Sequence, residues 1–334
     1  MNKKLIVIYL FLSLLFGDCK NTKKISTDVK LQNSDTTTSV KLQNSELIPF
    51  QKENKWGFCL PVPQTGNNDK KIIIECRFDE VHSFKEKLAA VNLNNKWGYI
   101  DSAGKDVIPF KYDYAEDFSE GLASVNIGGF SKGKWGFINK EGKEIIPFKY
   151  DEPSEFHEGF AGVHLNNKEG FIDSTGKQVT PFKYFNVFNF KEGLARVNIG
   201  IVFNGRGHEN YGKWGFVNKE GKEIISLIYD EAQDFDDGLA LVKLNNKFGY
   251  INKKGKDVIP IKYERASLFF EGLALLELNN KYGFVDKSGK EIIPFKYDFA
   301  DDFNKIKAGF AVVKLNYRVG YIDKNGKEYW WNEK

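Results

Sequence analysis

Residues 238 to 252 read Gly238-Leu239-Ala240-Leu241-Val242-Lys243-Leu244-Asn245-Asn246-Lys247-Phe248-Gly249-Tyr250-Ile251-Asn252. The side chains alternate strictly before the two asparagines, so Ala240, Val242 and Leu244 share one face of a strand. The same positions in other parts of the chain are again apolar, which assigns this face to the core. The asparagine pair tolerates positive φ at both places, as a two-residue hairpin turn requires. The stretch therefore predicts an antiparallel β-hairpin with one buried face.

This hairpin recurs along the chain. Aligning the chain on its glycine gives eight copies, with the glycine at Gly57, Gly98, Gly136, Gly170, Gly215, Gly249, Gly283 and Gly320. The shortest spacing is 34 residues, and the longer spacings of 41, 38, 45 and 37 place every extra residue in a connection between strands. A period of this size predicts a modular array in which each copy is completed by its neighbours.

Each copy continues beyond the hairpin. Residues 134 to 139 form the returning strand, and Asn139-Lys140-Glu141-Gly142 matches a type I turn closed by a left-handed glycine. Residues 144 to 148 predict a third strand, whose Pro147 cannot donate a ladder hydrogen bond and so marks an edge or a bulge. The linking stretch at residues 112 to 118 fits either a short fourth strand or a single helical turn.

The recurring motif resembles a known family. Its instances are Lys55-Trp56-Gly57-Phe58, Lys96-Trp97-Gly98-Tyr99, Lys134-Trp135-Gly136-Phe137 and Lys213-Trp214-Gly215-Phe216. They are similar to the WG (or KWG) repeats of bacterial proteins, and the resemblance covers residues 46 to 330. It implies a β-repeat with no established common activity. In four copies another residue replaces the tryptophan of the motif, namely Glu169, Phe248, Tyr282 and Val319.

The expected fold class is all-β, with tandem antiparallel hairpin repeats in an open twisted array. The first copy begins at Leu47 with a first hairpin strand and the last ends near Tyr329 with a third strand. Propellers commonly close by splitting one blade between the termini, and no such split is visible. A closed seven- or eight-bladed β-propeller remains the alternative.

Three segments are expected. Residues 1–19 have a basic start and an apolar run, which predicts a signal peptide ending at Cys19 in a lipobox-like position. Lipidation of Cys19 would anchor the protein to a membrane, although Asp18 departs from the usual small residue and leaves ordinary cleavage or an uncleaved anchor open. Residues 20–45 are a polar, flexible tether, and residues 46–334 are the eight-copy repeat domain.

The remaining composition narrows the function classes. The formal net charge is only +4 with both signs interspersed, which gives no support to nucleic-acid binding. Cys59 and Cys76 could form a disulfide after export, but they occupy repeat positions that are not expected to face each other. Two buried thiols are the preferred interpretation.

No motif for catalysis or for a cofactor is found. The four histidines occupy different positions of different repeats, so they form no motif of a metal site or of a catalytic triad. Acidic stretches at residues 234–237 and 298–302 lack regular ligand spacing for calcium and are interpreted as solvated turns. We expect no enzyme, no metal and no cofactor, with an unrecognised hydrolase as a weak alternative.

The irregular hairpin tips are the candidate binding sites. In the third and fifth copies the two-residue turn is replaced by residues 128–133 and 200–212, two insertions at equivalent tips. Insertions in repeat proteins often build the binding face. The candidate contact residues are Phe130 in the first insertion and Phe203, Arg206, His208 and Tyr211 in the second. The tryptophan ladder could stack on sugars, but packing between copies is the preferred interpretation.

The expected function is that of a non-enzymatic, envelope-tethered protein that presents a binding surface to a protein or glycan of the cell envelope. The alternative is a structural envelope component without a dedicated ligand. The expected location is exported: lipid-anchored in the cell envelope, at the periplasm or outer membrane, or secreted.

Overall fold

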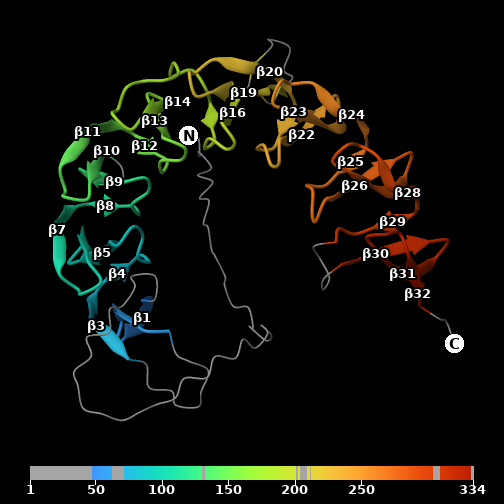
Figure 1. Cartoon of the computed structure of the whole chain (residues 1–334). Coiled ribbons are helices and arrows are strands. Elements are labelled where there is room, and N and C mark those ends of the chain that lie inside the picture. Colours follow the sequence, from blue (N-terminus) through green and yellow to red (C-terminus); the bar gives the residue numbers. More distant parts are fainter. Residues whose placement is uncertain are drawn as a thin grey trace, which may run out of the picture. The chain divides into compact units, whose positions relative to one another are not determined.

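A computed structural model describes residues 47–61, 71–129, 132–200, 202–203, 209–210, 212–303 and 309–331. The chain divides into the units Met1–Leu42 and Gln43–Lys334, and all described residues belong to the second. These residues form strands and no helix, as Figure 1 shows. No helix long and apolar enough to cross a membrane occurs in them.

The strands form eight small antiparallel sheets, one for each copy, and one further two-stranded hairpin. The first four sheets contain β1 (Ile48–Lys52), β2 (Lys55–Cys59) and β3 (Ile72–Phe78); β4 (Glu80–Val81), β5 (Ala89–Leu93), β6 (Lys96–Ile100) and β7 (Asp106–Tyr112); β8 (Tyr114–Ala115), β9 (Leu122–Ile127), β10 (Lys134–Asn139) and β11 (Glu144–Tyr150); and β12 (Glu152–Pro153), β13 (Phe160–Leu165) and β14 (Lys168–Asp173).

The last four sheets contain β15 (Asn186–Val187), β16 (Leu194–Asn198), β19 (Trp214–Asn218) and β20 (Glu223–Tyr229); β21 (Glu231–Ala232), β22 (Leu239–Leu244), β23 (Lys247–Asn252) and β24 (Asp257–Tyr263); β25 (Arg265–Ala266), β26 (Leu273–Leu278), β27 (Lys281–Asp286) and β28 (Glu291–Tyr297); and β29 (Phe299–Ala300), β30 (Phe310–Leu315), β31 (Arg318–Asp323) and β32 (Glu328–Trp330). The extra hairpin pairs β17 (Val202–Phe203) with β18 (Glu209–Asn210).

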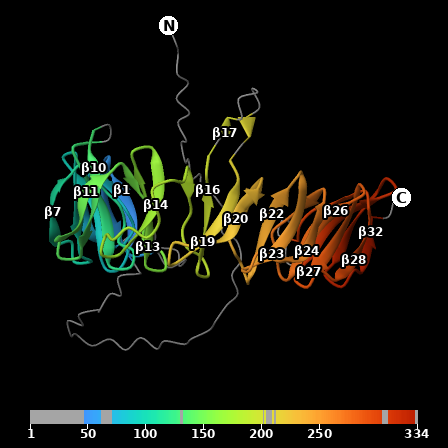
Figure 2. The same ribbon diagram turned by 90° about the horizontal axis from the view of Figure 1, so that it is seen from above.

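The linking stretch is a short fourth strand rather than a helical turn. In the third copy Tyr114 and Ala115 pair with Asn126 and Val125 of β9, on the edge opposite the third strand. Six copies therefore have four strands in chain order, whereas the first and fourth copies have three. The strands of successive copies follow one another in Figure 2.

The turns have the geometry that their residues predict. Asn245 and Asn246 have φ values of 51° and 61°, so both adopt the left-handed conformation of a primed turn. In the following turn Gly142 has a φ of 74°, and its N–H donates to the carbonyl oxygen of Asn139 at 2.9 Å. The Asn139 side chain also accepts a hydrogen bond from the Lys143 N–H at 2.9 Å. The predicted role of this asparagine as a turn residue is confirmed.

The third strand bulges over the glycine of the motif. In the second copy Trp97 of β6 pairs with Tyr112 of β7, and Tyr99 pairs with Ile108. The pairing advances by two residues along β6 but by four along the edge strand β7, so β7 holds two extra residues at this point. The bulge brings the Ile108 carbonyl oxygen to 2.6 Å from where a Cβ on Gly98 would lie. Only glycine fits there, because any side chain would strike backbone. The predicted bulge at the proline is confirmed.

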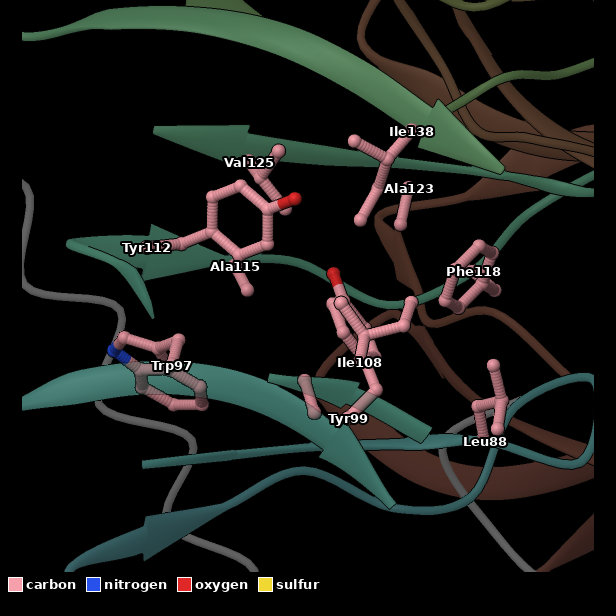
Figure 3. Packing of buried hydrophobic residues seen from close by; sticks show 11 residues of the cluster. Leu88, Trp97, Tyr99, Ile108, Tyr112, Ala115, Phe118, Ala123, Val125 and Ile138 are labelled. Atoms are coloured by element: carbon pink, nitrogen blue, oxygen red, sulfur yellow. The ribbon is translucent and has the colours of Figure 1, made fainter. Parts of the chain in front are cut away.

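The hydrophobic core lies between the copies. Figure 3 shows one cluster, in which Trp97, Tyr99 and Ile108 of the second copy meet Ala123 and Val125 of the third. Trp97 is only 5% exposed, as the packing interpretation predicts. Six further clusters join the other consecutive pairs of copies in the same way. Each copy is therefore completed by its neighbours.

One aromatic contact recurs at every junction. The aromatic residue after the motif glycine contacts a phenylalanine of the following linker, at ring-centroid distances from 4.7 to 5.0 Å: Phe58–Phe84, Tyr99–Phe118, Phe137–Phe156, Phe171–Phe190, Phe216–Phe235, Tyr250–Phe269 and Phe284–Phe303. In the last copy Tyr321 contacts Trp331 instead, at 5.8 Å. Trp331 thus makes the contact that a linker phenylalanine makes in the other copies.

The array is open. Every sheet in the described part of the chain is built from strands of one copy, interrupted only by the β17–β18 hairpin in the fifth, and none closes into a barrel. Each hydrophobic cluster likewise joins only consecutive copies. The all-β class and the open array of hairpin repeats are therefore confirmed.

The two cysteines of the first copy are both free. Cys59 is buried on β2, and Cys76 is half-buried on β3. The Cys76 thiol lies 3.5 Å from the carbonyl oxygen of Phe50. Burial raises the pKa of this thiol. Both thiols are free as expected, but the prediction that both are buried holds only for Cys59.

Candidate functional site at the junction of the fourth and fifth copies

The side chains proposed from the sequence lie outside the described residues. Phe203 is placed only through its backbone, in β17 opposite Glu209. The sequence-predicted contacts Phe130, Arg206, His208 and Tyr211, and the lipidation candidate Cys19, fall on residues that the structure does not describe. The base of the larger insertion is described, because the Ile199 N–H donates to the Lys213 carbonyl at 3.4 Å. The site is therefore built from the residues around this base.

A recurrent ion pair, here called the junction tie, links most copies to the next. At its second occurrence Lys96 Nζ lies 2.6 Å from Asp113 Oδ1, and Asp113 Oδ2 accepts a hydrogen bond from the Gly128 N–H in the next hairpin turn at 2.8 Å. The Lys96 ammonium group holds the pKa of Asp113 below its usual value. One carboxylate thereby connects two copies.

Six of the seven junctions contain this tie. The lysine, the carboxylate and the turn residue are Lys55, Asp79 and Asn94; Lys96, Asp113 and Gly128; Lys134, Asp151 and Asn166; Lys213, Asp230 and Asn245; Lys247, Glu264 and Asn279; and Lys281, Asp298 and Asn316. At the fourth junction Phe185 occupies the position of the carboxylate. The tie cannot form there.

The fourth junction departs from the repeat in further ways. Glu169 replaces the tryptophan of the motif, and the third strand is reduced to two isolated bridges, Ile172–Gln178 and Glu169–Tyr184. In place of a strand, the Thr180 hydroxyl accepts a hydrogen bond from the Phe171 N–H at 2.8 Å. The larger insertion begins at the next hairpin tip. Four departures thus occur at one junction.

A cavity of about 160 Å³ opens at this junction. It is lined by Glu152, Pro153, Ser154, Gly162, Val163, His164, Glu169 and Val187. Gly162 keeps it open, because a Cβ at this position would lie 2.8 Å from Val187 Cγ2. Equivalent residues in other copies, such as Leu241 and Arg196, carry large side chains there.

Charge in this cavity is concentrated on glutamates. Glu169 Oε2 accepts a hydrogen bond from the Val187 N–H at 2.6 Å, which connects the fourth copy to the fifth. Burial raises the pKa of Glu169, while the Val187 N–H and His164 act in the opposite direction. Ser154 accepts a hydrogen bond from the Gly162 N–H at 2.9 Å. The cavity therefore presents acceptors on a partly apolar wall.

Apolar side chains are exposed beside the insertion. Phe185 is 53% exposed, Phe188 41% and Ile199 37%. A Cβ on Gly200, the first residue of the insertion, would lie 2.8 Å from the Cβ of Phe185, so this ring lies at the insertion's base. Exposed aromatic residues near a surface insertion are typical of contact surfaces.

A second cavity of about 160 Å³ differs in its electrostatics. It is lined by Lys191, Gln233, Asp234, Asp236, Leu239, Leu241, Tyr250, Leu268 and Phe269. Asp234 and Asp236 are already paired, with Arg196 at 3.0 Å and Lys191 at 2.9 Å. Both aspartates of the second cavity therefore already have a cationic partner within the chain.

The acidic stretches flagged in the sequence belong to ion pairs. Asp237 pairs with Lys287, and Asp298 pairs with Lys281 at 2.5 Å. No group of three or more His, Cys, Asp or Glu side chains suited to a metal ion occurs among the residues described.

The sequence carries more signals of this site than the motif alone shows. Glu169 is visible as a departure from the motif. Phe185, Gly162 and the weak third strand of the fourth copy become visible only when the copies are compared position by position, which places all of them at one junction.

Comparison with known proteins supports the repeat assignment. The profile of the family described as "WG containing repeat" matches residues 67–97, 97–129, 135–168, 170–200, 214–248, 248–282 and 282–318. No curated protein sequence matches the chain.

Among solved structures, a eukaryotic initiation factor is similar at 10% identity with a TM-score of 0.36, covering 85% of this chain and 96% of that one. Hsv2 of Kluyveromyces lactis is similar at 9% identity with a TM-score of 0.34, covering 72% and 87%. AztD of Citrobacter koseri is similar at 12% identity with a TM-score of 0.29, covering 74% and 80%. At these values none of the three bears on function.

Proposed function

This chain belongs to the WG-containing repeat family, and on that premise we propose that it is a non-enzymatic, envelope-tethered protein that binds a protein or glycan partner. The binding surface is the fourth junction together with the insertion at residues 200–212. The tether is residues 20–45, and Cys19 is the point of lipid attachment after export.

One observation supports this proposal above all others. The regular positions of the repeat are used in folding, in the bulge, the junction ties and the clusters between copies. The departures from the repeat instead gather at the junction of the fourth and fifth copies, where a cavity, exposed Phe185 and the larger insertion lie together. The fourth junction lacks both the tie and the third strand that stabilise other junctions. A role in binding best explains why this junction departs from the repeat.

Replacing the insertion tests the proposal without opening the hairpin. In other copies an Asn-Asn pair joins the equivalents of Ile199 and Lys213, as at Asn94 and Asn95. Exchanging residues 200–212 for Asn-Asn restores this turn. We expect the variant to keep its circular dichroism spectrum and to lose its partner in pull-downs from envelope extracts of the source bacterium.

Two further variants complete the design. Exchanging residues 128–133 for Asn-Asn measures separately the contribution of Phe130. Exchanging Asn279-Asn280 for Asp-Gly, another primed-turn pair, is the matched control. Undiminished capture by the variant lacking residues 200–212 would contradict the proposal and favour a structural envelope component. Treating the captured material with protease or glycosidase distinguishes a protein partner from a glycan.

Mass spectrometry of the mature N-terminus tests the anchor. We expect Cys19 as the first residue with added acyl mass. A free amine on an unmodified Cys19, or an N-terminus elsewhere, would contradict lipidation.

A further inference from the structure

The cavity at the fourth junction is part of a row of residues that recurs in other copies. In the fourth copy Glu152 lies opposite His164, and His164 lies opposite Glu169, across three neighbouring strands. The sixth copy has Glu231, Lys243 and Phe248 at the same positions. Cross-strand neighbours of this kind are close enough to interact directly.

In two other copies the carboxylate of this row is neutralised by a cation of the chain itself. Lys243 Nζ lies 2.7 Å from Glu231 Oε1 in the sixth copy. In the seventh copy Arg265 Nε lies 3.1 Å from Glu277 Oε2. The row is therefore a place where this fold accommodates a cation beside a carboxylate.

In the fourth copy His164 holds the position of Lys243, and a carboxylate lies on each side of it. Glu152 and Glu169 flank His164, and no ion pair among the described residues joins either glutamate to a lysine or arginine. Burial raises the pKa of Glu169, and the Val187 N–H and His164 offset this effect only in part. Removing a charge from water is unfavourable unless an opposite charge is supplied.

The shape of the cavity fits an aliphatic stem. Pro153 and Val187 provide apolar wall, and Gly162 leaves the space that a larger residue would fill. The volume of about 160 Å³ has room for several non-hydrogen atoms. Aromatic residues, on which sugars commonly stack, do not line it.

We propose that this cavity takes a lysine side chain of a protein partner, with its ammonium group beside the carboxylates of Glu152 and Glu169 and next to His164. The inference rests on the proposed function, because it names the chemistry that the partner offers to the fourth junction. The ammonium group supplies a positive charge to the two carboxylates that flank His164, the residue at the position of Lys243. The methylene groups pack against Pro153 and Val187.

Small probes test the charge requirement directly. Nα-acetyl-lysine methylamide and its norleucine analogue differ in the ammonium group, and each is titrated into the full chain by NMR. We expect saturable binding of the lysine probe, on the order of millimolar because the ligand is small, and at least about tenfold weaker binding of norleucine. Equal binding of the two probes would overturn the proposal, whatever the behaviour of any variant.

Variants then assign the site. Glu169→Gln and Glu152→Gln keep the shape of the side chain and should each weaken the lysine probe about tenfold, as loss of a charged partner does. Glu169→Trp restores the residue found in other copies and should abolish binding by filling the cavity. Glu141→Gln, an exposed turn residue of the third copy, is the matched control. Unchanged binding in both glutamine variants would place the probe elsewhere and overturn the proposal.

The two proposals fail separately. If the Asn-Asn variant of residues 200–212 loses its partner while Glu169→Gln and Glu152→Gln bind partner and probe like wild type, the lysine inference is wrong and the binding function stands. If the lysine probe binds the cavity but no variant at this junction changes partner capture, the proposed function is wrong.

Discussion

At Gly98 the backbone of the third strand passes so close that no side chain fits. The bulge places the Ile108 carbonyl oxygen 2.6 Å from an ideal Cβ, and the equivalent glycines of most other copies meet backbone at similar distances. The glycine of the motif is thus explained by the strand that folds over it. This explanation requires no ligand.

Gly98→Ala should therefore be strongly destabilising. We expect a loss of about 3 kcal/mol, because the obstacle is backbone and cannot rotate away. Gly121→Ala is the matched comparison: Gly121 has a φ of 84° and open space around it, so only the left-handed backbone is penalised, by about 1 kcal/mol. Urea unfolding of both variants measures the difference, and equal losses would contradict the steric explanation.

His82 introduces a pH dependence at the second junction. Its Nδ1 lies 3.0 Å from Asp117 Oδ1, and this hydrogen bond raises the pKa of His82 above 6.5 despite partial burial. Glu116 and Glu80 add to the effect, and the Trp97 ring lies 5.0 Å away. A raised folded-state pKa means that the stabilisation is fully present below pH 6.5 and is lost as the pH rises through the folded value.

The wild-type melting temperature should accordingly fall as the pH rises above 6.5. Asp117→Asn removes the acceptor charge and should flatten this part of the profile. Differential scanning fluorimetry across the range checks both. A wild-type profile as flat as that of the variant would show that the pair contributes nothing.

Residue patterns predicted the turns well and the site poorly. The φ values of Asn245 and Asn246 and the bulge at the proline follow from local chemistry, which the sequence shows directly. The role of Glu169 does not, because its effect depends on Val187 in the next copy and on the missing third strand. Contacts between copies are not visible in one copy alone.

Among elements, the junction tie joins hairpins of successive copies at every junction except the fourth. Asp298 pairs with Lys281 and accepts a hydrogen bond from the Asn316 N–H at 2.8 Å. Lys281 holds the pKa of Asp298 below its usual value, so this contribution is present above the unfolded-state pKa and is lost as the pH falls through the folded value.

Asp298→Asn should loosen the last copy selectively. We expect faster hydrogen exchange at the Asn316 amide and through β30 and β31, with β22 and β23 unaffected because copies contact only their neighbours. Hydrogen-exchange mass spectrometry resolves these segments. Uniform acceleration along the whole chain would contradict a local tie.

In the last sheet Trp331 contacts the motif aromatic residue that a linker phenylalanine contacts in the other copies. The Trp331 ring centroid lies 5.8 Å from that of Tyr321, and the Trp331 backbone N–H donates to the Val319 carbonyl at 3.3 Å. Trp331→Ala should destabilise the last copy by about 1 kcal/mol, since an aromatic pair of half-exposed rings is lost. Trp331→Phe keeps a ring and should retain most of the stability. Equal melting of both variants would rule out a covering role.

The short fourth strand shows the limit of element prediction. Tyr114 and Ala115 alone fit a strand or a helical turn, and pairing with Asn126 and Val125 of the neighbouring hairpin decides between them. The hairpins, whose strands and turn are contiguous, were predicted from local sequence because their partners are a few residues away.

At the scale of the whole molecule, the positions used in folding are separate from those proposed for binding. Seven clusters between copies and six junction ties hold the regular positions, whereas the fourth junction lacks its tie and carries the cavity with two glutamates. The central claim is that partners bind where the copies differ.

Photo-crosslinking tests this claim most directly. A photoreactive amino acid is placed singly at Phe185 and Ile199, beside the fourth junction, and at Asn94, Asn279 and Tyr317, at regular hairpin tips. After irradiation with envelope extract, partner adducts are quantified by mass spectrometry. The account predicts adducts from Phe185 and Ile199 and none above background from the regular tips. Adducts distributed evenly over the five positions, or confined to the regular tips, would contradict it.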